Sequence, residues 1–171
     1  MKLLVISDLH GRTDLLRRAV LTHSDRDGIL FLGDGTSDIE VNELTRGGRL
    51  FAGVRGNCDP TYVRAQEYDF DTELLLNIGE YTVIMMHGHL HGVKQGLERA
   101  VAYAASRGAD ILLYGHTHIP AESYYAEGRE IGGVVLKKPL WVMNPGSLCG
   151  GSYGLLQIRR GNILISHGVL N

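Results

Sequence analysis

The chain has 171 residues, of which 44% are hydrophobic and 21% charged, so we expect one ordinary globular domain spanning residues 1–171. Its formal net charge of −2 and its scattered lysines and arginines argue against binding to duplex nucleic acid. No apolar run approaches the ~18 residues of a membrane span, no signal peptide is evident, and Cys58 and Cys149 do not amount to a disulfide framework, so we expect a cytoplasmic protein with no membrane partner.

Strand-like and helical segments alternate in the first part of the chain. The strand-like runs are Lys2–Ser7, Gly28–Leu32, Arg49–Val54, Tyr81–Met86 and Asp110–Tyr114. Thr13 is a suitable cap for a first helix, and Asp38–Thr45 predicts a second, weaker one. Gln95–Arg107 is the clearest helix, because its apolar residues follow helical spacing and Gly108 supplies a stop.

Beyond His118 the pattern predicts only strands. They are Ala121–Ala126, Glu130–Leu136, Leu140–Met143, Tyr153–Arg159 and Ile163–Gly168, divided by short polar and glycine-containing turns. A βαβα half followed by an antiparallel half, with no linker, predicts an α/β (α+β) fold. We expect its two sheets to pack face to face with helices outside.

Each of the five strand-like runs in the first part ends in a group of potential metal ligands. These groups are Asp8-Leu9-His10, Gly33-Asp34, Gly56-Asn57-Cys58-Asp59, His87-Gly88-His89 and Gly115-His116-Thr117-His118. Strands side by side in a sheet bring their carboxyl ends to one edge, where open α/β sheets bind ligands. The converging carboxylates, amide and imidazoles are about as many donors as two metal ions need, which predicts a two-metal hydrolase.

Each group taken alone has a simpler explanation. Asp8 would serve as a helix cap, Asp34 as a turn carboxylate, and Asn57 as a turn residue. Separate caps and turns explain poorly why all five groups stand at the ends of predicted strands. The combined pattern therefore favours a shared site.

The remaining histidines have weaker assignments. His89 lies one strand period after His87, and contact with substrate and orientation of a ligand are about equally good interpretations. His91 is expected to be solvated or bonded to a partner side chain, and His23 and His167 to be surface or packing residues.

Other catalytic schemes lack their motifs. No G-x-S-x-G elbow surrounds Ser7 or Ser147. The chain also lacks the phosphate-binding G-x-x-x-x-G-K-[ST] loop and the G-x-G-x-x-G dinucleotide fingerprint. Nucleotide hydrolysis of the P-loop kind is therefore excluded.

The ordered set of five groups resembles the calcineurin-like metallophosphoesterases. The short length, the cysteine in the third motif and the late Asn144-Pro145-Gly146-Ser147 are similar to the YfcE-type phosphodiesterase subgroup. The resemblance covers Lys2 to about Ser147. It implies a four-layer α-β-β-α sandwich of two mixed sheets, with a dinuclear metal site at the strand ends.

The resemblance also implies a ligand set and a mechanism. The first ion would be held by Asp8, His10, Asp34 and His118, and the second by Asp34, Asn57, His87 and His116. Asp34 would bridge two divalent ions, with Mn²⁺ expected first and Fe, Ni, Zn or Mg as alternatives. A bridging hydroxide would attack phosphorus in line, and Asn57 and His89 would contact the substrate.

One departure from the family pattern concerns the leaving group. Many relatives carry a histidine at the position of Cys58, where it assists departure of the leaving group. A thiol of pKa ~8.5 is a poorer acid for this purpose than imidazole. His89 is the available substitute.

The resemblance favours a phosphodiesterase acting on a small phosphodiester. One alternative is a phosphomonoesterase, because the same metal site serves both esters. Another is a non-catalytic scaffold similar to the small retromer subunit, which carries asparagine at the bridging position and aspartate at the amide position. Here those residues are Asp34 and Asn57, so catalysis is favoured. Exposed edges of the C-terminal strands offer a route to a homodimer or higher oligomer.

Overall fold

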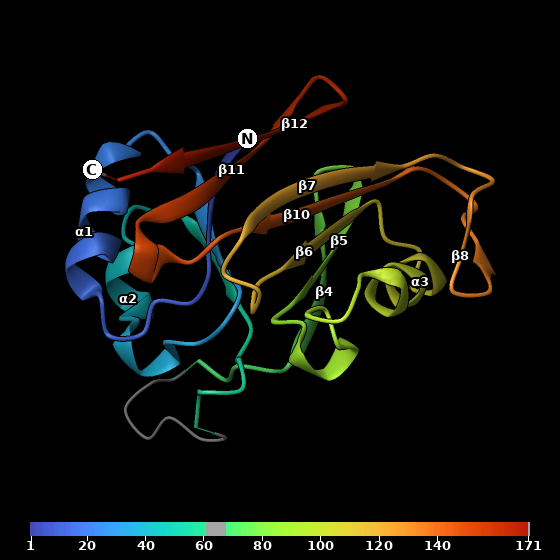
Figure 1. Ribbon diagram of the computed structural model, residues 1–171. Coiled ribbons are helices and arrows are strands. Elements are labelled where there is room, and N and C mark those ends of the chain that lie inside the picture. The colour runs from blue at the N-terminus through green and yellow to red at the C-terminus, as the bar shows by residue number, and fades with distance from the viewer. Residues whose placement is uncertain (61–67, 171) are drawn as a thin grey trace.

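The computed structural model describes residues 1–60 and 68–170 and contains two five-stranded mixed sheets (Figure 1). In the first sheet the strand order is β12 (Asn162–Val169), β11 (Ser152–Arg159), β1 (Lys2–Ile6), β2 (Gly28–Phe31) and β3 (Leu50–Gly53). Strands β1, β2 and β3 are parallel, whereas β11 and β12 run antiparallel to their neighbours. The C-terminal hairpin thus completes a sheet begun by the N-terminus.

The second sheet has the order β4 (Glu73–Ile78), β5 (Tyr81–Met86), β6 (Ile111–Tyr114), β10 (Leu140–Pro145) and β7 (Pro120–Tyr125). Strands β5, β6 and β10 are parallel, and the edge strands β4 and β7 are antiparallel to them. A separate hairpin joins β8 (Glu130–Ile131) to β9 (Val134–Val135).

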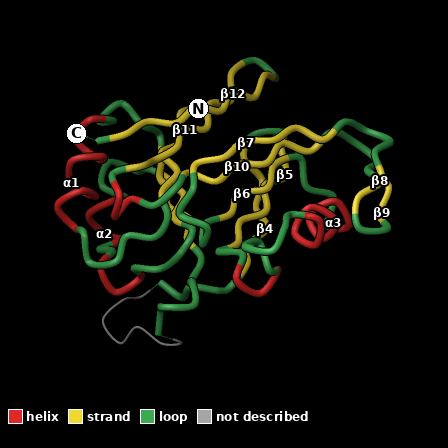
Figure 2. The backbone as a smooth tube through the Cα atoms, viewed as in Figure 1, coloured by secondary structure: helices red, strands yellow, loops and turns green. Residues whose placement is uncertain are grey.

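Helices cover the outer faces of the two sheets (Figure 2). The α-helices are α1 (Thr13–Thr22), α2 (Val41–Leu44) and α3 (Glu98–Ser106), and the 3₁₀ helices are η1 (Thr36–Asp38), η2 (His89–His91) and η3 (Leu148–Gly150). No helix among residues 1–60 and 68–170 is long and apolar enough to cross a membrane.

Three apolar layers hold the sandwich together, and the two-residue period of strands explains their arrangement. In β1, Leu4 and Ile6 pack with α1 residues on the outer face, while Leu3 and Val5 join the cluster between the sheets. A third cluster joins the second sheet to Val101 and other residues of α3. The expected four-layer α-β-β-α sandwich of two mixed sheets is confirmed.

Several details of the predicted elements differ from the structure. Strand β4 was not predicted, because its Leu-rich sequence lacks the alternation of a half-buried strand. The helix expected over Asp38–Thr45 is reduced to η1 and the short α2. The strand expected over Glu130–Leu136 is instead a hairpin, because Gly132 and Gly133 both adopt positive φ at its turn.

The C-terminal strands do not form a sheet of their own, although the sequence pattern had suggested one. Strand β10 lies parallel to β6, and β11 pairs with β1, so neither sheet consists of one half of the chain. As a consequence, β1, β2 and β3 of one sheet and β5 and β6 of the other all direct their carboxyl ends toward the predicted ligand groups.

Candidate metal centre

The ends of β1, β2, β5 and β6 bring most of the predicted metal ligands together. Three groups of side chains have ligand atoms within 4.8 Å of one another: Asp8 with His10 and His118, Asp8 with Asp34 and His87, and His10 with Asp34 and Cys58. Because the groups share Asp8, His10 and Asp34, they form one continuous cluster that spans both sheets.

Asp34 lies at the centre of this cluster and is almost completely buried. Its Oδ2 is 3.4 Å from His87 Nε2 and 3.9 Å from His10 Nε2. Its Oδ1 accepts a hydrogen bond of 2.8 Å from the backbone N–H of Cys58. Asp34 Oδ2 therefore lies close to two candidate ligands, His10 on the first sheet and His87 on the second, and the bridging role of Asp34 remains a prediction.

Asp8 is fully buried, and its two oxygens have different surroundings. Oδ2 accepts a hydrogen bond from the backbone N–H of His116 at 3.2 Å. Oδ1 is 3.0 Å from His118 Nε2 and 3.9 Å from His87 Nε2, but it has no hydrogen-bond partner among the described residues. A buried carboxylate oxygen without such a partner is costly unless a cation lies beside it, so the site fits a metal ion.

The contacts of His87 orient its ring for metal binding. Nδ1 lies 2.7 Å from the carbonyl oxygen of Leu32, which can only accept, so Nδ1 carries the hydrogen. In the neutral ring, Nε2 then carries the lone pair, 3.4 Å from Asp34 Oδ2 and within hydrogen-bond distance, 3.2 Å, of His116 Nδ1. A backbone carbonyl that fixes the tautomer is a common arrangement behind a metal-binding histidine.

The contact between Asp34 and His87 favours the charged form of each side chain. Burial by itself would raise the pKa of Asp34, but contact with the His87 ring and the hydrogen bond from the Cys58 N–H lower this pKa overall. Burial would likewise lower the pKa of His87, yet contact with Asp34 and the charge of Asp8 raise it. The contact between Asp34 and His87 thus contributes to both shifts.

The backbone at the cluster is held in an unusual conformation. Six non-glycine residues of the described chain have positive φ, and five of them are candidate ligands: Asp8, His10, Asp34, His116 and His118. Such a conformation costs on the order of 1–3 kcal/mol per residue and persists where the surrounding structure imposes it. The strain therefore marks these strand ends as a built site.

Asp59 organises the loops that carry Asp34 and Asn57. Its carboxylate accepts hydrogen bonds from four backbone N–H groups, at distances of 2.7–2.8 Å. The donors are Asp34, Gly35, Thr36 and Gly56. Sequence reasoning placed Asp59 within a motif but gave it no role, and its position after Asn57 was the only available signal.

The Asn144–Ser147 segment supports the other loops. Asn144 Nδ2 donates to the carbonyl oxygen of Gly115 and to Thr117 Oγ1, at 2.9 and 3.0 Å. Ser147 Oγ donates to the carbonyl oxygen of Asp8 at 3.0 Å. The sequence had linked this segment only to a subgroup of the family, whereas the structure shows that it supports the ligand loops of both sheets.

The remaining candidates lie at the margin of the cluster. Asn57 is exposed, and its Nδ2 donates to Cys58 Sγ at 3.2 Å, so its part in holding the second ion remains a prediction. The His89 ring centroid lies 5.5 Å from that of His87 and 6.2 Å from that of His116. His91 is bonded to Glu73, His23 packs on Tyr153, and His167 contacts the carbonyl oxygen of Asn144.

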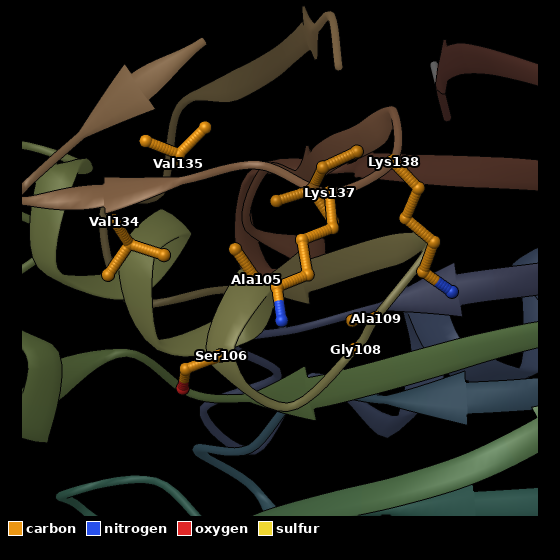
Figure 3. Close-up of a pocket in the computed structure, with 9 residues that line it drawn as sticks. Ala105, Ser106, Gly108, Ala109, Val134, Val135, Lys137 and Lys138 are labelled. Carbon is orange, nitrogen blue, oxygen red and sulfur yellow. The ribbon is translucent and has the colours of Figure 1, made fainter. Parts of the chain in front are cut away.

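A cavity of about 540 Å³ lies away from these residues, between the end of α3 and β9 (Figure 3). Ala105, Val134 and Lys137 contribute to its lining, and none of the candidate ligands does. The donor chemistry, rather than the cavity, identifies the functional site.

Gly56 offers a test of how closely the backbone must approach Asp34. A Cβ atom at this position would lie 2.1 Å from Asp34 Oδ1, so Gly56→Ala is expected to displace the carboxylate and to reduce Mn²⁺ affinity at least tenfold. Isothermal titration with Mn²⁺ measures the change. Gly150→Ala is the matched control, because a Cβ there meets no atom within 4 Å. Equal affinities of the two variants would contradict the expectation.

Comparison with known protein families identifies the architecture. A family model described as "Calcineurin-like phosphoesterase superfamily domain" matches residues 1–161. The chain is 36% identical over 148 residues to the probable metallophosphoesterase YsnB of Bacillus subtilis (strain 168), covering 86% of this chain and 75% of that protein. It is 27% identical over 188 residues to phosphodiesterase YfcE of Escherichia coli (strain K12), covering 91% of this chain and 87% of that protein.

Solved structures share the fold. A predicted phosphoesterase from Streptococcus pneumoniae TIGR4 superposes with a TM-score of 0.70 at 22% identity, covering 98% of this chain and 88% of that one. Wild-type Vps29 from Entamoeba histolytica, solved in complex with Zn²⁺, superposes with a TM-score of 0.66 at 23% identity and full coverage of both chains (100% each).

Proposed function

The chain belongs to the calcineurin-like phosphoesterase superfamily and is a metal-dependent phosphoesterase, and from this membership we propose that it hydrolyses small phosphodiesters at the cluster around Asp34. The observation that carries the proposal is the arrangement of Asp8, Asp34 and His87, whose ligand atoms come from both sheets and lie within 4.8 Å of one another. The proposal treats residues 1–171 as a single catalytic domain.

The donor set fits a pair of divalent ions. Asp8, His10, Asp34 and His118 would hold one, and Asp34, Asn57, His87 and His116 the other. Two such ions would lower the pKa of a bound water to ~7 in favourable cases, which would activate it for attack on phosphorus, and would offset the charge on the phosphate oxygens. Carboxylate, amide and imidazole ligands together suit borderline-hard cations, and we propose Mn²⁺ as the first choice.

We assign substrate contact to Asn57 and His89. Asn57 is exposed beside Cys58, and the His89 ring lies near His87 and His116, so both border the cluster. The Nδ1 atom of His89 is buried without a hydrogen-bond partner among the described residues. In this proposal His89 donates a proton or a hydrogen bond to the departing oxygen.

The substrate range follows from the residues near the leaving group. A thiol at Cys58 is a weak acid near neutral pH, so we expect a nitrophenyl diester to be hydrolysed at least about a hundredfold faster than an alkyl diester. A panel of nitrophenyl and alkyl diesters and nitrophenyl monoesters, assayed with each divalent metal in turn, tests this and the proposed function together. Equal rates for good and poor leaving groups would contradict the leaving-group argument.

The same panel separates the catalytic alternatives. Faster turnover of monoesters than of diesters would favour a phosphomonoesterase. A scaffold function is the other candidate, since Vps29 structures share the fold. The scaffold carries asparagine at the bridging position and aspartate at the amide position. This chain has Asp34 and Asn57 there, which supports catalysis.

We propose that the protein acts in the cytoplasm, without duplex nucleic acid or membrane partners. Self-association is supported by the edge strand β12, which, within the described part of the chain, pairs with β11 alone. It carries no charged residue, and Leu164 and Val169 are 58% and 63% exposed. Such an edge favours pairing with a second copy of the chain.

A further inference from the structure

Three polar side chains beside the candidate metal centre bind one another although they come from three separate elements. Glu73 begins β4, His91 ends η2, and Tyr103 lies in α3. Glu73 Oε1 is 2.5 Å from His91 Nε2, and Glu73 Oε2 accepts a hydrogen bond of 2.6 Å from the Tyr103 hydroxyl. The rings of His91 and Tyr103 pack with centroids 4.7 Å apart. We refer to these residues as the Glu73–His91–Tyr103 cluster.

The cluster is well enough shielded from water to fix its geometry. The side chains of His91 and Glu73 are 13% and 27% exposed. Burial by itself would raise the pKa of Glu73, but the Tyr103 hydroxyl and His91 lower this pKa overall, so the carboxylate is ionised at neutral pH. Hydrogen bonds to an ionised acceptor are about twice as strong as neutral ones, and here both oxygens are engaged.

The cluster attaches η2 to the second sheet through the His91 side chain. This 3₁₀ helix has three residues, begins after Gly88 and ends before Gly92, and both glycines have positive φ. Leu90 is 55% exposed, so it does not bury η2 against the fold. His91 is the residue of η2 whose side chain bonds to the second sheet, through Glu73.

His89 occupies the first position of η2. No side-chain hydrogen bond among the described residues holds its buried Nδ1, and its ring faces those of His87 and His116 at centroid distances of 5.5 and 6.2 Å. The direction of the His89 ring therefore depends on the backbone of η2. His91 lies two residues further along the same 3₁₀ helix.

We infer that Glu73, His91 and Tyr103 are positioning residues that hold η2, and with it the His89 imidazole, against the candidate metal centre. This inference rests on the proposed function, in which His89 contacts the substrate. It assigns a role in the reaction to residues that none of the five ligand motifs contains.

The kinetic test compares Tyr103→Phe and Glu73→Gln with a matched control. Each variant is expected to lower kcat/KM for an alkyl diester about tenfold while the Mn²⁺ affinity stays unchanged. Tyr81→Phe is the control, because it also removes a tyrosine hydroxyl that hydrogen-bonds, in this case to the carbonyl oxygen of Gly161. The control should retain full activity.

A double-mutant cycle then separates positioning from general damage. In a His89→Ala background, Tyr103→Phe and Glu73→Gln are expected to cause no further loss, because the group they position is already absent. Multiplicative losses in the cycle would overturn the inference. Tyr103→Phe removes a single oxygen, so it carries the test if Glu73→Gln does not fold.

A second measurement needs no activity. In NMR spectra of the metal-free protein, the Cε1–Hε1 signal of His89 is expected to shift in Tyr103→Phe and Glu73→Gln, while that of His167 stays in place. Tyr81→Phe should leave both signals unchanged. A stationary His89 signal in both cluster variants would overturn the inference. If the wild-type protein hydrolyses no phosphoester, the proposed function fails, and the His89 signal still decides whether the cluster positions the ring.

Discussion

Asp34→Asn is expected to lower kcat/KM for a nitrophenyl diester about a thousandfold, equivalent to about 4 kcal/mol of transition-state stabilisation. The amide has nearly the shape of the carboxylate but lacks the charge, and only one of its two terminal atoms can bind a cation. Because Asp34 Oδ2 faces both His87 and His10, the substitution should also weaken Mn²⁺ binding. Steady-state kinetics and isothermal titration measure the two effects.

The control for this experiment is Asp110→Asn. Asp110 precedes β6, at the opposite end of that strand from His116, and pairs with Lys138 at 2.7 Å. The same chemical change there should leave kcat/KM within about twofold of the wild-type value. If Asp34→Asn hydrolysed the diester as fast as the wild-type protein, the role assigned to Asp34 would be wrong.

Asp59→Asn is expected to lower the free energy of unfolding of the metal-free protein strongly. The carboxylate accepts hydrogen bonds from four backbone N–H groups. The single oxygen of an asparagine side chain would accept fewer, and the amide hydrogens of that side chain would face the remaining N–H donors. A loss of about 3 kcal/mol in the free energy of unfolding is expected, because hydrogen bonds to charged groups contribute ~1.5–3 kcal/mol each and are not additive. The corresponding fall in Tm is roughly 6–12 °C.

Urea and thermal unfolding of the metal-free protein measure this loss. Asp69→Asn makes the same change at an exposed aspartate and should alter Tm by no more than about 2 °C. Matching Tm values for the two variants would show that the four N–H groups find other acceptors. Because Asp59 also fixes the backbone of Asp34, Asp59→Asn should reduce diester hydrolysis even where it remains folded.

Much of the candidate site was predictable because the signal is local. Asp8, Asp34, His87 and His116 each follow an apolar run, and parallel strands bring their carboxyl ends to a common edge. Strand positions alone define that edge, so errors in the predicted helix boundaries do not affect it. The structure brings these side chains together there, while their division between two ions remains a proposal.

The supporting contacts were not predictable in the same way. Asp59 bonds to the backbone of residues 23 to 25 positions earlier, and Ser147 Oγ to Asp8, 139 positions away. No periodicity connects such partners. A distant contact also accounts for the short α2. The Asp38 carboxylate accepts a hydrogen bond of 2.8 Å from the Gly11 N–H instead of capping a longer helix. Tertiary contacts here override local propensity.

The candidate ligands come from two separately hydrogen-bonded sheets, with Asp8 and Asp34 on one and His87 and His116 on the other. A cation bound by both sets would connect the two sheets, so its binding would stabilise the fold. The stabilisation grows as RT ln(1 + [L]/Kd), or about 2.7 kcal/mol at a hundredfold excess over Kd. The free energy of unfolding would then depend on the concentration of the free ion.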